Sequence, residues 1–159
     1  MAANWDAIGE RGQALAFVTL MQRSRGGVRL FRLQFLGDKY PAVDHFVDLL
    51  GGDDELTPFF FVQVKTTTLG YTEQGTLRVQ VSETAMKRLR AYPAPTYIIG
   101  VDEPQEALFL IAAVHGGPSH FPSLPTTHRI DASLLRDLYD EVVHFWRSYD
   151  AKFRSSRFT

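Results

Sequence analysis

The segment FFFVQVKTTT, residues 59–68, constrains the fold more than any other part of the chain. Aromatic and β-branched residues dominate it, and because successive side chains of a strand point to opposite faces, both faces of this strand are predicted to be buried. A strand covered on both faces belongs inside a sheet that has a layer on each side. One face nevertheless ends in Gln63 and Lys65, where a purely structural strand would stay apolar.

The patterns on either side of this strand predict the remaining elements. Helices are predicted at residues 6–23 and 83–92, and a long C-terminal helix is predicted to start at an Asp131 cap and to carry an apolar stripe as far as Phe153. Strands are predicted at residues 28–36, 43–50, 59–67, 77–81, 97–101 and 107–114. This order predicts a single α/β domain over residues 1–159, with a central mixed sheet flanked by helices.

Composition excludes several classes of protein. Because none of the 159 residues is cysteine, a disulfide scaffold, a thiolate-bound metal site and a cysteine nucleophile are excluded, and a reducing cytoplasm is the expected location. There are 17 lysines and arginines against 18 aspartates and glutamates, which gives a net charge of −1 without the basic excess usual in sequence-independent nucleic-acid binding. No stretch has the apolar pattern of a signal peptide or the length of a membrane span, so no membrane contact is expected.

Three predicted elements each direct a polar side chain at the core. In the first helix, Glu10 lies on the same helical stripe as apolar residues four, seven and eleven positions later, so its carboxylate is predicted to face the sheet. In the second strand, Asp44 and Asp48 share a face but lie about 13 Å apart along the strand, so only one of them can bind an ion together with the third strand. Gln63 and Lys65 on the third strand complete the set.

A buried carboxylate is costly unless it is paired or binds a metal. The simplest interpretation of these residues is structural, with Glu10 or Asp44 either forming an ion pair with Lys65 or capping the amides of a loop. Taken together, two carboxylates, the Gln63 amide oxygen and an ammonium group suit a hard cation such as Mg²⁺ beside a lysine that faces a phosphate. Both interpretations make the same four residues the candidate site: Glu10, Asp44, Gln63 and Lys65.

Three sequence motifs carry a resemblance to a known family. Glu10 in GERG, Asp44 in YPAVDHFVDLL and Gln63-Val64-Lys65 in FFFVQVKTTT resemble the PD-(D/E)XK, or restriction-endonuclease-like, nuclease superfamily in its QxK form. The resemblance extends over the later segments PAPTYIIGVDE and ALFLIAAV, and it is strongest to a bacterial branch that is known as a domain of unknown function. It implies an α-β-β-β-α-β core, here with a further strand and a long C-terminal helix, and a hydrolase that cuts phosphodiester bonds with the help of a metal ion.

The resemblance also implies a role for each residue. Asp44 would be the main metal ligand, Gln63 would take a place usually held by a carboxylate, and the backbone carbonyl of Val64 would complete the coordination sphere. Lys65 would orient or activate the attacking water and stabilise charge on the phosphate. Glu10 would hold a bound water or a second ion. The implied cofactor is Mg²⁺ or Mn²⁺, with weaker Mg²⁺ affinity because Gln63 removes one negative charge from the usual set.

Two hypotheses about function follow from these residues. The first is a metal-dependent nuclease that cuts DNA or, as the second choice of substrate, RNA. The other is a catalytically inactive member of the fold that binds nucleic acid or a protein partner, within a bacterial defence or toxin system. Neutral net charge and Gln63 favour the inactive module, whereas the presence of Glu10, Asp44 and Lys65 together favours the enzyme. Either a homodimer or a complex with a partner protein is compatible with both.

Overall fold

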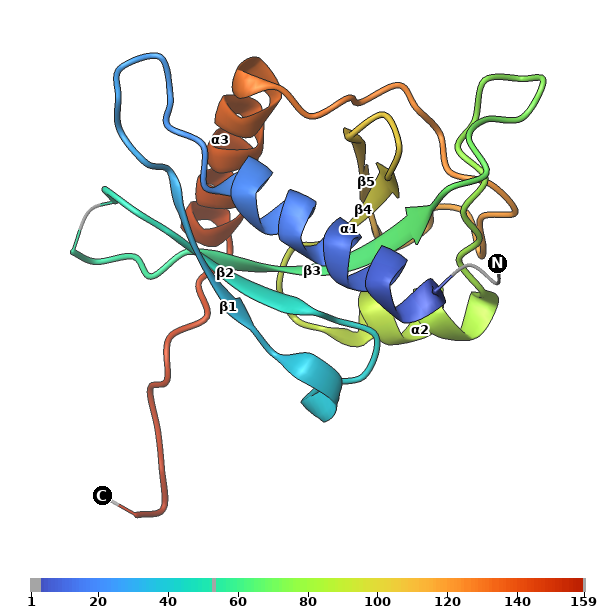
Figure 1. Ribbon diagram of the computed structural model, residues 1–159. Coiled ribbons are helices and arrows are strands. Elements are labelled where there is room, and N and C mark those ends of the chain that lie inside the picture. Colours follow the sequence, from blue (N-terminus) through green and yellow to red (C-terminus); the bar gives the residue numbers. More distant parts are fainter. Residues whose placement is uncertain (1–3, 53, 159) are drawn as a thin grey trace.

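The computed structural model describes residues 4–52 and 54–158, and it has the predicted α/β architecture (Figure 1). Its helices are α1 (Trp5–Leu20), α2 (Glu83–Ala91) and α3 (Ala132–Ser148), with a short 3₁₀ helix η1 (Gly37–Lys39). Its strands are β1 (Phe31–Phe35), β2 (His45–Leu49), β3 (Phe59–Thr67), β4 (Thr96–Asp102) and β5 (Ala107–Ala112). The short strand predicted at 77–81 does not form, and this segment makes isolated bridges to the loop that follows β5.

The strands form one mixed sheet of five strands in the order β1-β2-β3-β4-β5. The first three are antiparallel neighbours, β4 lies parallel to β3, and β5 is antiparallel to β4. The parallel pair needs a crossover connection, and α2 lies in it. β2 pairs with β3 only over residues 59–62, whereas β4 pairs with residues 61–67. The second half of β3 therefore has a strand neighbour on one side only.

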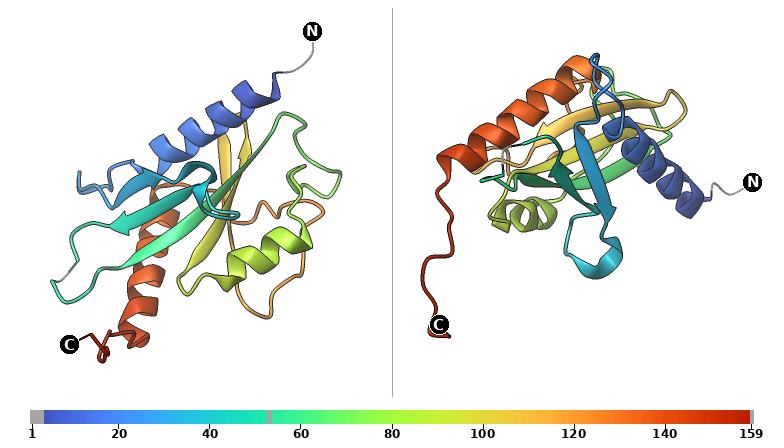
Figure 2. Two further views of the ribbon diagram at one scale, coloured as in Figure 1. Left: turned by 90° about the horizontal axis from the view of Figure 1, so that it is seen from below. Right: turned by 90° about the vertical axis from the view of Figure 1, so that its left-hand side faces the viewer.

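Each face of the sheet has its own apolar core. The right-hand view of Figure 2 shows α1 and α3 over one face and α2 over the other. The first core joins Ala16 and Leu20 of α1 to the side of β3 that carries Phe60 and Val62. The second core joins α2 to loop residues such as Leu77 and to the opposite side of the sheet. The prediction that β3 is covered on both faces is confirmed.

Each of the α-helices α1, α2 and α3 is preceded by a residue whose side chain accepts a hydrogen bond from a backbone amide of the first turn, as helix caps do. The caps and their donors are Asn4 from the amide of Ala7 at 3.3 Å, Ser82 from Ala85 at 3.1 Å and Asp131 from Leu134 at 2.8 Å. The helix starts predicted for Glu83 and for the segment after Asp131 are confirmed. Each is preceded by a residue that has a short polar side chain and an extended backbone.

The last helix ends earlier than predicted. Ser148 is the final residue of α3, and Tyr149 already has an extended backbone, with φ −100° and ψ 96°. The prediction that the apolar stripe reaches Phe153 is wrong, because Phe153 is 90% exposed. The fully buried residues of α3 end at Val142. Val143 and Trp146 still pack against the core in part, but residues 147–155 are exposed, so burial does not support the helix beyond Ser148.

The closest approach of α1 to the sheet is at Gly12. A Cβ atom at this position would lie 1.8 Å from Thr66 Oγ1 and 2.8 Å from Thr66 Cβ, so glycine alone leaves room for the strand. This contact fixes how α1 is rotated over β3, and thereby where its polar residues point.

Gly12→Ala is expected to lower the free energy of unfolding by about 1–3 kcal/mol, because the added methyl group must displace β3 or the helix. Gly9→Ala is the matched control in the same helix. Nothing lies within 4 Å of a Cβ atom at Gly9, so this change is expected to raise stability by up to about 1 kcal/mol through helix propensity. Urea denaturation of both variants measures the difference. Equal stability of the two variants would contradict the close contact.

Candidate functional site

The candidate site lies where β2 stops and β3 continues (Figure 1). The ladder between the two strands ends at the pair His45 and Val62. Backbone groups of successive strand residues point to alternate sides. The Val62 carbonyl points toward β2, where it accepts a hydrogen bond from the amide of Asp44 at 2.8 Å. The amide and carbonyl of Val64 point the same way, into a gap that β2 no longer fills.

The Asp44 carboxylate lies in this gap. Its Oδ2 accepts a hydrogen bond from the Val64 backbone N–H at 2.6 Å. A short bond from an N–H to an ionised oxygen is stronger than a neutral one, so it holds the carboxylate against the backbone between Gln63 and Lys65. The structure thus brings together Asp44 and the VQVK motif, 20 residues apart in sequence.

Gln63 has a buried oxygen without a partner. The residue is 7% exposed, and its Oε1 forms no hydrogen bond within the described part of the chain. A buried polar atom in this state costs about 1–3 kcal/mol, so native proteins rarely retain one without a ligand or a function. A neutral oxygen that is already free of competing donors is a suitable ligand for a hard cation.

Lys65 shares the face of Gln63, because the two residues are two positions apart on β3. Gln63 pairs with Ile98 of β4, and Lys65 pairs with Gly100. It is half-buried and forms no ion pair with any residue that the structure describes. The interpretation of Lys65 as a structural partner of Glu10 or Asp44 is therefore not realised in the described residues. Leu77 and Leu124 pack over Gly100 and form an apolar wall beside the lysine.

Asp48 lies away from the site. It forms an ion pair with Arg32 of β1 at 2.8 Å and stands opposite Phe59, at the far end of β2. Of the two aspartates on this face of β2, Asp44 is the one beside Gln63.

The prediction that Glu10 faces the sheet is wrong. The buried residues of α1 are Gly12, Ala16 and Leu20, whereas Glu10 is exposed. Ala14, which was placed on the same predicted stripe, is exposed as well. The physical reason is the contact of Gly12 with Thr66: the small residues of α1 turn to the sheet because they allow the closest packing, and the Glu10 stripe rotates away from it.

Glu10 nevertheless lies on the flank of α1 that faces β2. Arg11 lies on the opposite flank of α1. It forms ion pairs with two glutamates of the turn between β4 and β5, so this flank faces that turn. Phe17 follows Glu10 by seven residues and so lies on the same line along the helix. The ring centroid of Phe17 is 6.4 Å from that of His45 at the start of β2. Glu10 lies about 10 Å further toward the N-terminus on this line.

Two further polar residues have buried, unpartnered atoms on the face of the sheet opposite to Gln63 and Lys65, and neither has a counterpart in the sequence-based prediction. Gln13 lies on α1 between Glu10 and Phe17, and its Oε1 is buried without a partner. His45 is 2% exposed, and its Nδ1 is also unpartnered. Burial lowers the pKa of His45, and the charge of Asp44 opposes this shift without reversing it, so the ring is neutral at pH 7. The spacing of Gln13, three residues after Glu10, could have identified it.

An oxygen-only site fits this donor set. In the described part of the chain, no three His, Asp or Glu side chains gather closely enough to hold a metal ion by themselves. A cation in the gap would instead rely on one carboxylate from Asp44 and two neutral oxygens, from the Gln63 side chain and the Val64 backbone. Hard cations accept such ligands, and the single charge favours an ion that tolerates a poor set, such as Mn²⁺.

Comparison with known proteins identifies no relative. No family model matches the chain, and neither a curated protein nor a solved structure is significantly similar to it. Among the described residues, no helix combines the length and the apolar character that crossing a membrane requires. The function is therefore inferred from the chain's own residues.

Asp44→Ala is expected to lower the free energy of unfolding by about 1–3 kcal/mol in metal-free buffer, because the Val64 amide loses its acceptor. Asp44→Asn keeps a side-chain oxygen that can accept the same bond, so its loss is expected to be smaller. Asp54→Ala, in the exposed turn between β2 and β3, is the control and should change stability little. Chemical denaturation with a chelator present measures all three. An unchanged stability of Asp44→Ala would contradict a structural role for this bond.

Proposed function

We propose that this chain is a metal-dependent nuclease of the PD-(D/E)XK type, which hydrolyses phosphodiester bonds of DNA and, as the second choice, of RNA. The observation that carries the proposal is the hydrogen bond from the Val64 amide to the Asp44 carboxylate, one residue along the strand from Gln63, whose buried oxygen has no partner among the described residues. Asp44, Gln63 and Val64 are the residues that the resemblance names as metal ligands, and they meet at one point of the sheet.

The order of elements also supports this proposal. The resemblance implies an α-β-β-β-α-β core, and α1, β1, β2, β3, α2 and β4 follow one another in that order. β5 and α3 extend this core, as expected for a further strand and a C-terminal helix. The place where β2 stops beside β3 gives such a core an open strand side at which a phosphate can approach.

The chain's own residues would share the chemistry as follows. A bound Mg²⁺ or Mn²⁺ would supply Lewis-acid polarisation of the phosphate. Asp44, Gln63 and the Val64 carbonyl would hold the ion. The Lys65 ammonium would donate hydrogen bonds to a non-bridging phosphate oxygen and offset the negative charge that builds there during attack. Glu10 is exposed on α1, which covers the face of the sheet opposite to Gln63 and Lys65, so no step is assigned to it.

One specific observation favours a second candidate function. Glu10 is exposed and Gln63 is neutral, so Asp44 is the carboxylate that is hydrogen-bonded to the backbone of the VQVK motif. A set with this little charge suits a catalytically inactive module that binds nucleic acid, or a protein partner in a bacterial defence or toxin system. The two candidates differ in whether phosphodiester bonds are cut.

With Mn²⁺ present, the wild-type protein is expected to nick plasmid DNA, and Lys65→Ala is expected to lower the rate by roughly 10²–10³-fold, the usual loss when one donor to a developing charge is removed. Lys87→Ala is the matched control, because Lys87 is an exposed lysine of α2 that pairs with Glu83 at 3.1 Å. It should cleave like the wild type. Gel assays give the rates, and thermal melting shows whether each variant folds.

Equal cleavage by the wild type and Lys65→Ala would contradict the proposed role of Lys65. If the wild type binds DNA in a salt-dependent manner but cuts neither DNA nor RNA with any divalent ion, the inactive module is the correct function.

A further inference from the structure

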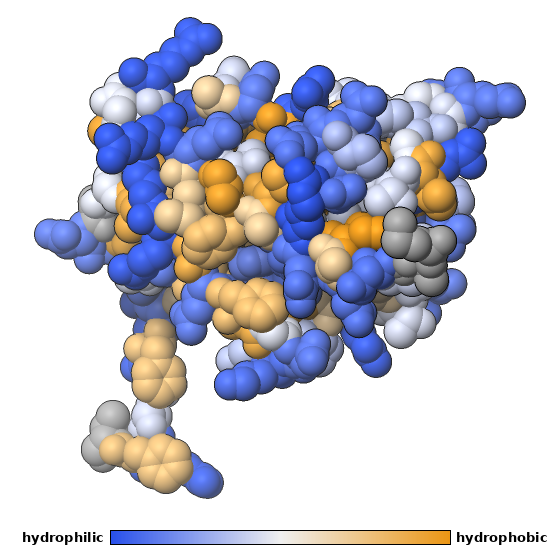
Figure 3. All heavy atoms as spheres, in the orientation of Figure 1, coloured by the Kyte–Doolittle hydropathy of each residue, from blue (hydrophilic) through white to orange (hydrophobic). Residues whose placement is uncertain are grey.

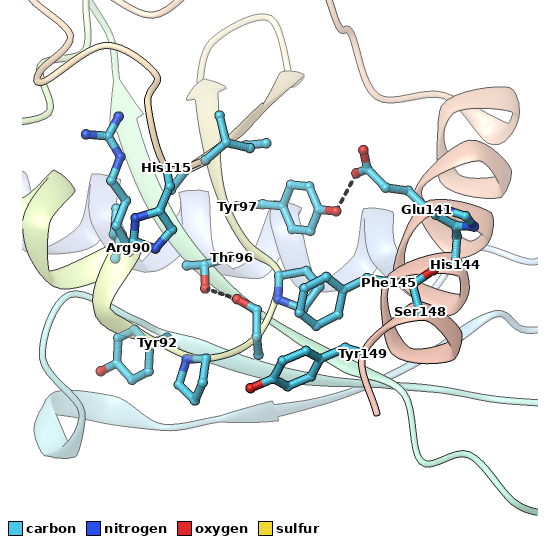
Figure 4. Close-up of a pocket in the computed structure, with 17 residues that line it drawn as sticks. Arg90, Tyr92, Thr96, Tyr97, His115, Glu141, His144, Phe145, Ser148 and Tyr149 are labelled. Atoms are coloured by element: carbon cyan, nitrogen blue, oxygen red, sulfur yellow. Dashed lines mark hydrogen bonds between the residues drawn. The ribbon is translucent and has the colours of Figure 1, made fainter. Parts of the chain in front are cut away.

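An apolar pocket lies at the start of β4, and none of the candidate site residues lines it (Figure 4). Its volume is about 680 Å³, within the range of roughly 300–1,000 Å³ that is typical of ligand pockets. Aromatic rings dominate its walls, together with two prolines of the segment between α2 and β4. The rings are those of Tyr92, Tyr97, Phe145 and Tyr149.

A second, acidic hollow continues this pocket along α3. The two hollows share Tyr97 and Glu141, and the second has a volume of about 460 Å³. The Tyr97 hydroxyl donates a hydrogen bond to Glu141, and burial together with this bond raises the pKa of Tyr97, so the tyrosine stays protonated. Asp131 and Asp137 line the second hollow together with Arg129 and His128, so that with Glu141 three carboxylates stand against one arginine. Together the hollows form a groove, here called the α3 groove, that is apolar at one end and has a net negative charge at the other, acidic end.

The segment after α3, residues 150–158, has the complementary character. It has no regular secondary structure up to a turn at residues 157–158, and beyond Lys152 it leads away from the body of the molecule, with apolar side chains on it (Figure 3). Phe153 is 90% exposed and Phe158 is 83% exposed. Lys152, Arg154 and Arg157 outnumber the single acidic residue, Asp150. Exposed aromatic side chains on a basic extended segment are typical of a part that binds elsewhere.

The first residues of a chain's own tail (residues 150–158) line a separate hollow beside Glu55 and Trp146, which shares Tyr149 with the α3 groove. The Lys152 ammonium donates a hydrogen bond at 3.1 Å to the Glu55 carbonyl in the turn between β2 and β3. Trp146 anchors the same side, with its indole N–H bonded to the Phe59 carbonyl at 2.8 Å. Phe145 and Ser148 face the groove on the other side of the helix. The occupant that reaches the groove without breaking these contacts is the tail of another copy.

We propose that the α3 groove binds the tail of a second copy of this chain, with Phe153 in the apolar pocket and Arg157 at the acidic end. In an extended segment these two side chains lie about 13 Å apart. Phe145, in the apolar pocket, and Asp137, at the acidic end, lie eight residues apart on α3, which is about 12 Å along the helix axis. Each copy gives its tail and receives the other, which closes a two-fold dimer. This dimer is independent of the proposed nuclease activity.

Sedimentation velocity of the full chain over a concentration series tests the dimer. The wild type is expected to show a monomer–dimer equilibrium. Phe153→Ala is expected to weaken the dimer by roughly 10³-fold, because the two-fold dimer loses two aromatic hot spots of roughly 30-fold each. Ser148→Trp, which fills the mouth of the pocket from an exposed position, should have a similar effect. Phe158→Ala removes an equally exposed ring outside the four-residue span and should dimerise like the wild type.

Mixing the two defective variants tests the contact itself. Ser148→Trp has an intact tail and Phe153→Ala has an open pocket, so the mixture is expected to form a heterodimer although each variant alone is monomeric. Arg157→Glu and Asp137→Lys should each weaken the dimer, and together they should restore it by exchanging the charges. Circular dichroism confirms that each variant is folded. A wild type that stays monomeric, a Phe153→Ala variant that dimerises normally, or a mixture that stays monomeric would each overturn the proposal.

Discussion

The hydrogen bond from the Val64 amide to the Asp44 carboxylate is the interaction on which the candidate site depends. β2 begins at His45, the residue after Asp44, so β3 has no strand neighbour on this side beyond Val62. The second half of β3 would otherwise expose its backbone groups to a gap. A carboxylate that replaces a strand neighbour satisfies the amide and brings a negative charge next to the backbone. Gln63 and Lys65 flank the same amide in sequence. One local substitution of a side chain for a strand therefore places a carboxylate against the backbone between Gln63 and Lys65, whereas Glu10 stays exposed on α1.

Sequence patterns predicted the sheet well because its central strand has few alternatives. The alternation in residues 59–67 places large apolar side chains on both faces, and β3 has those bounds in the structure. The meeting of Asp44 with the VQVK motif was expected from the shared face of β2 and β3. The direction of Glu10 was not predictable in this way, because apolar spacing does not report how closely a helix approaches its sheet. Gly12 decides that distance through its contact with Thr66, and it is an unremarkable residue in the sequence.

Two regions of the molecule differ in the character of their walls. On the face of β3 that carries Gln63 and Lys65, the buried Oε1 of Gln63 has no partner among the described residues, which is a sign of a site built for a polar ligand. At the start of β4 an apolar pocket is open, and the aromatic ring of Phe153, in the segment after α3, is exposed. The first region suits an ion and a phosphate, and the second suits an aromatic and basic peptide. In a dimer, two copies of the first region would be held in a fixed relation, as enzymes that cut both strands of a duplex require.

The central claim is that Asp44 and Gln63 bind one cation together with the Val64 carbonyl. Anomalous diffraction from crystals soaked in Mn²⁺ tests it most directly. The predicted result is a peak against the Asp44 carboxylate and Gln63 Oε1 that is absent from crystals of Asp44→Ala. A peak at other residues, with both of these oxygens free of metal, would contradict the claim, and so would the absence of any peak at Mn²⁺ concentrations that saturate binding in solution.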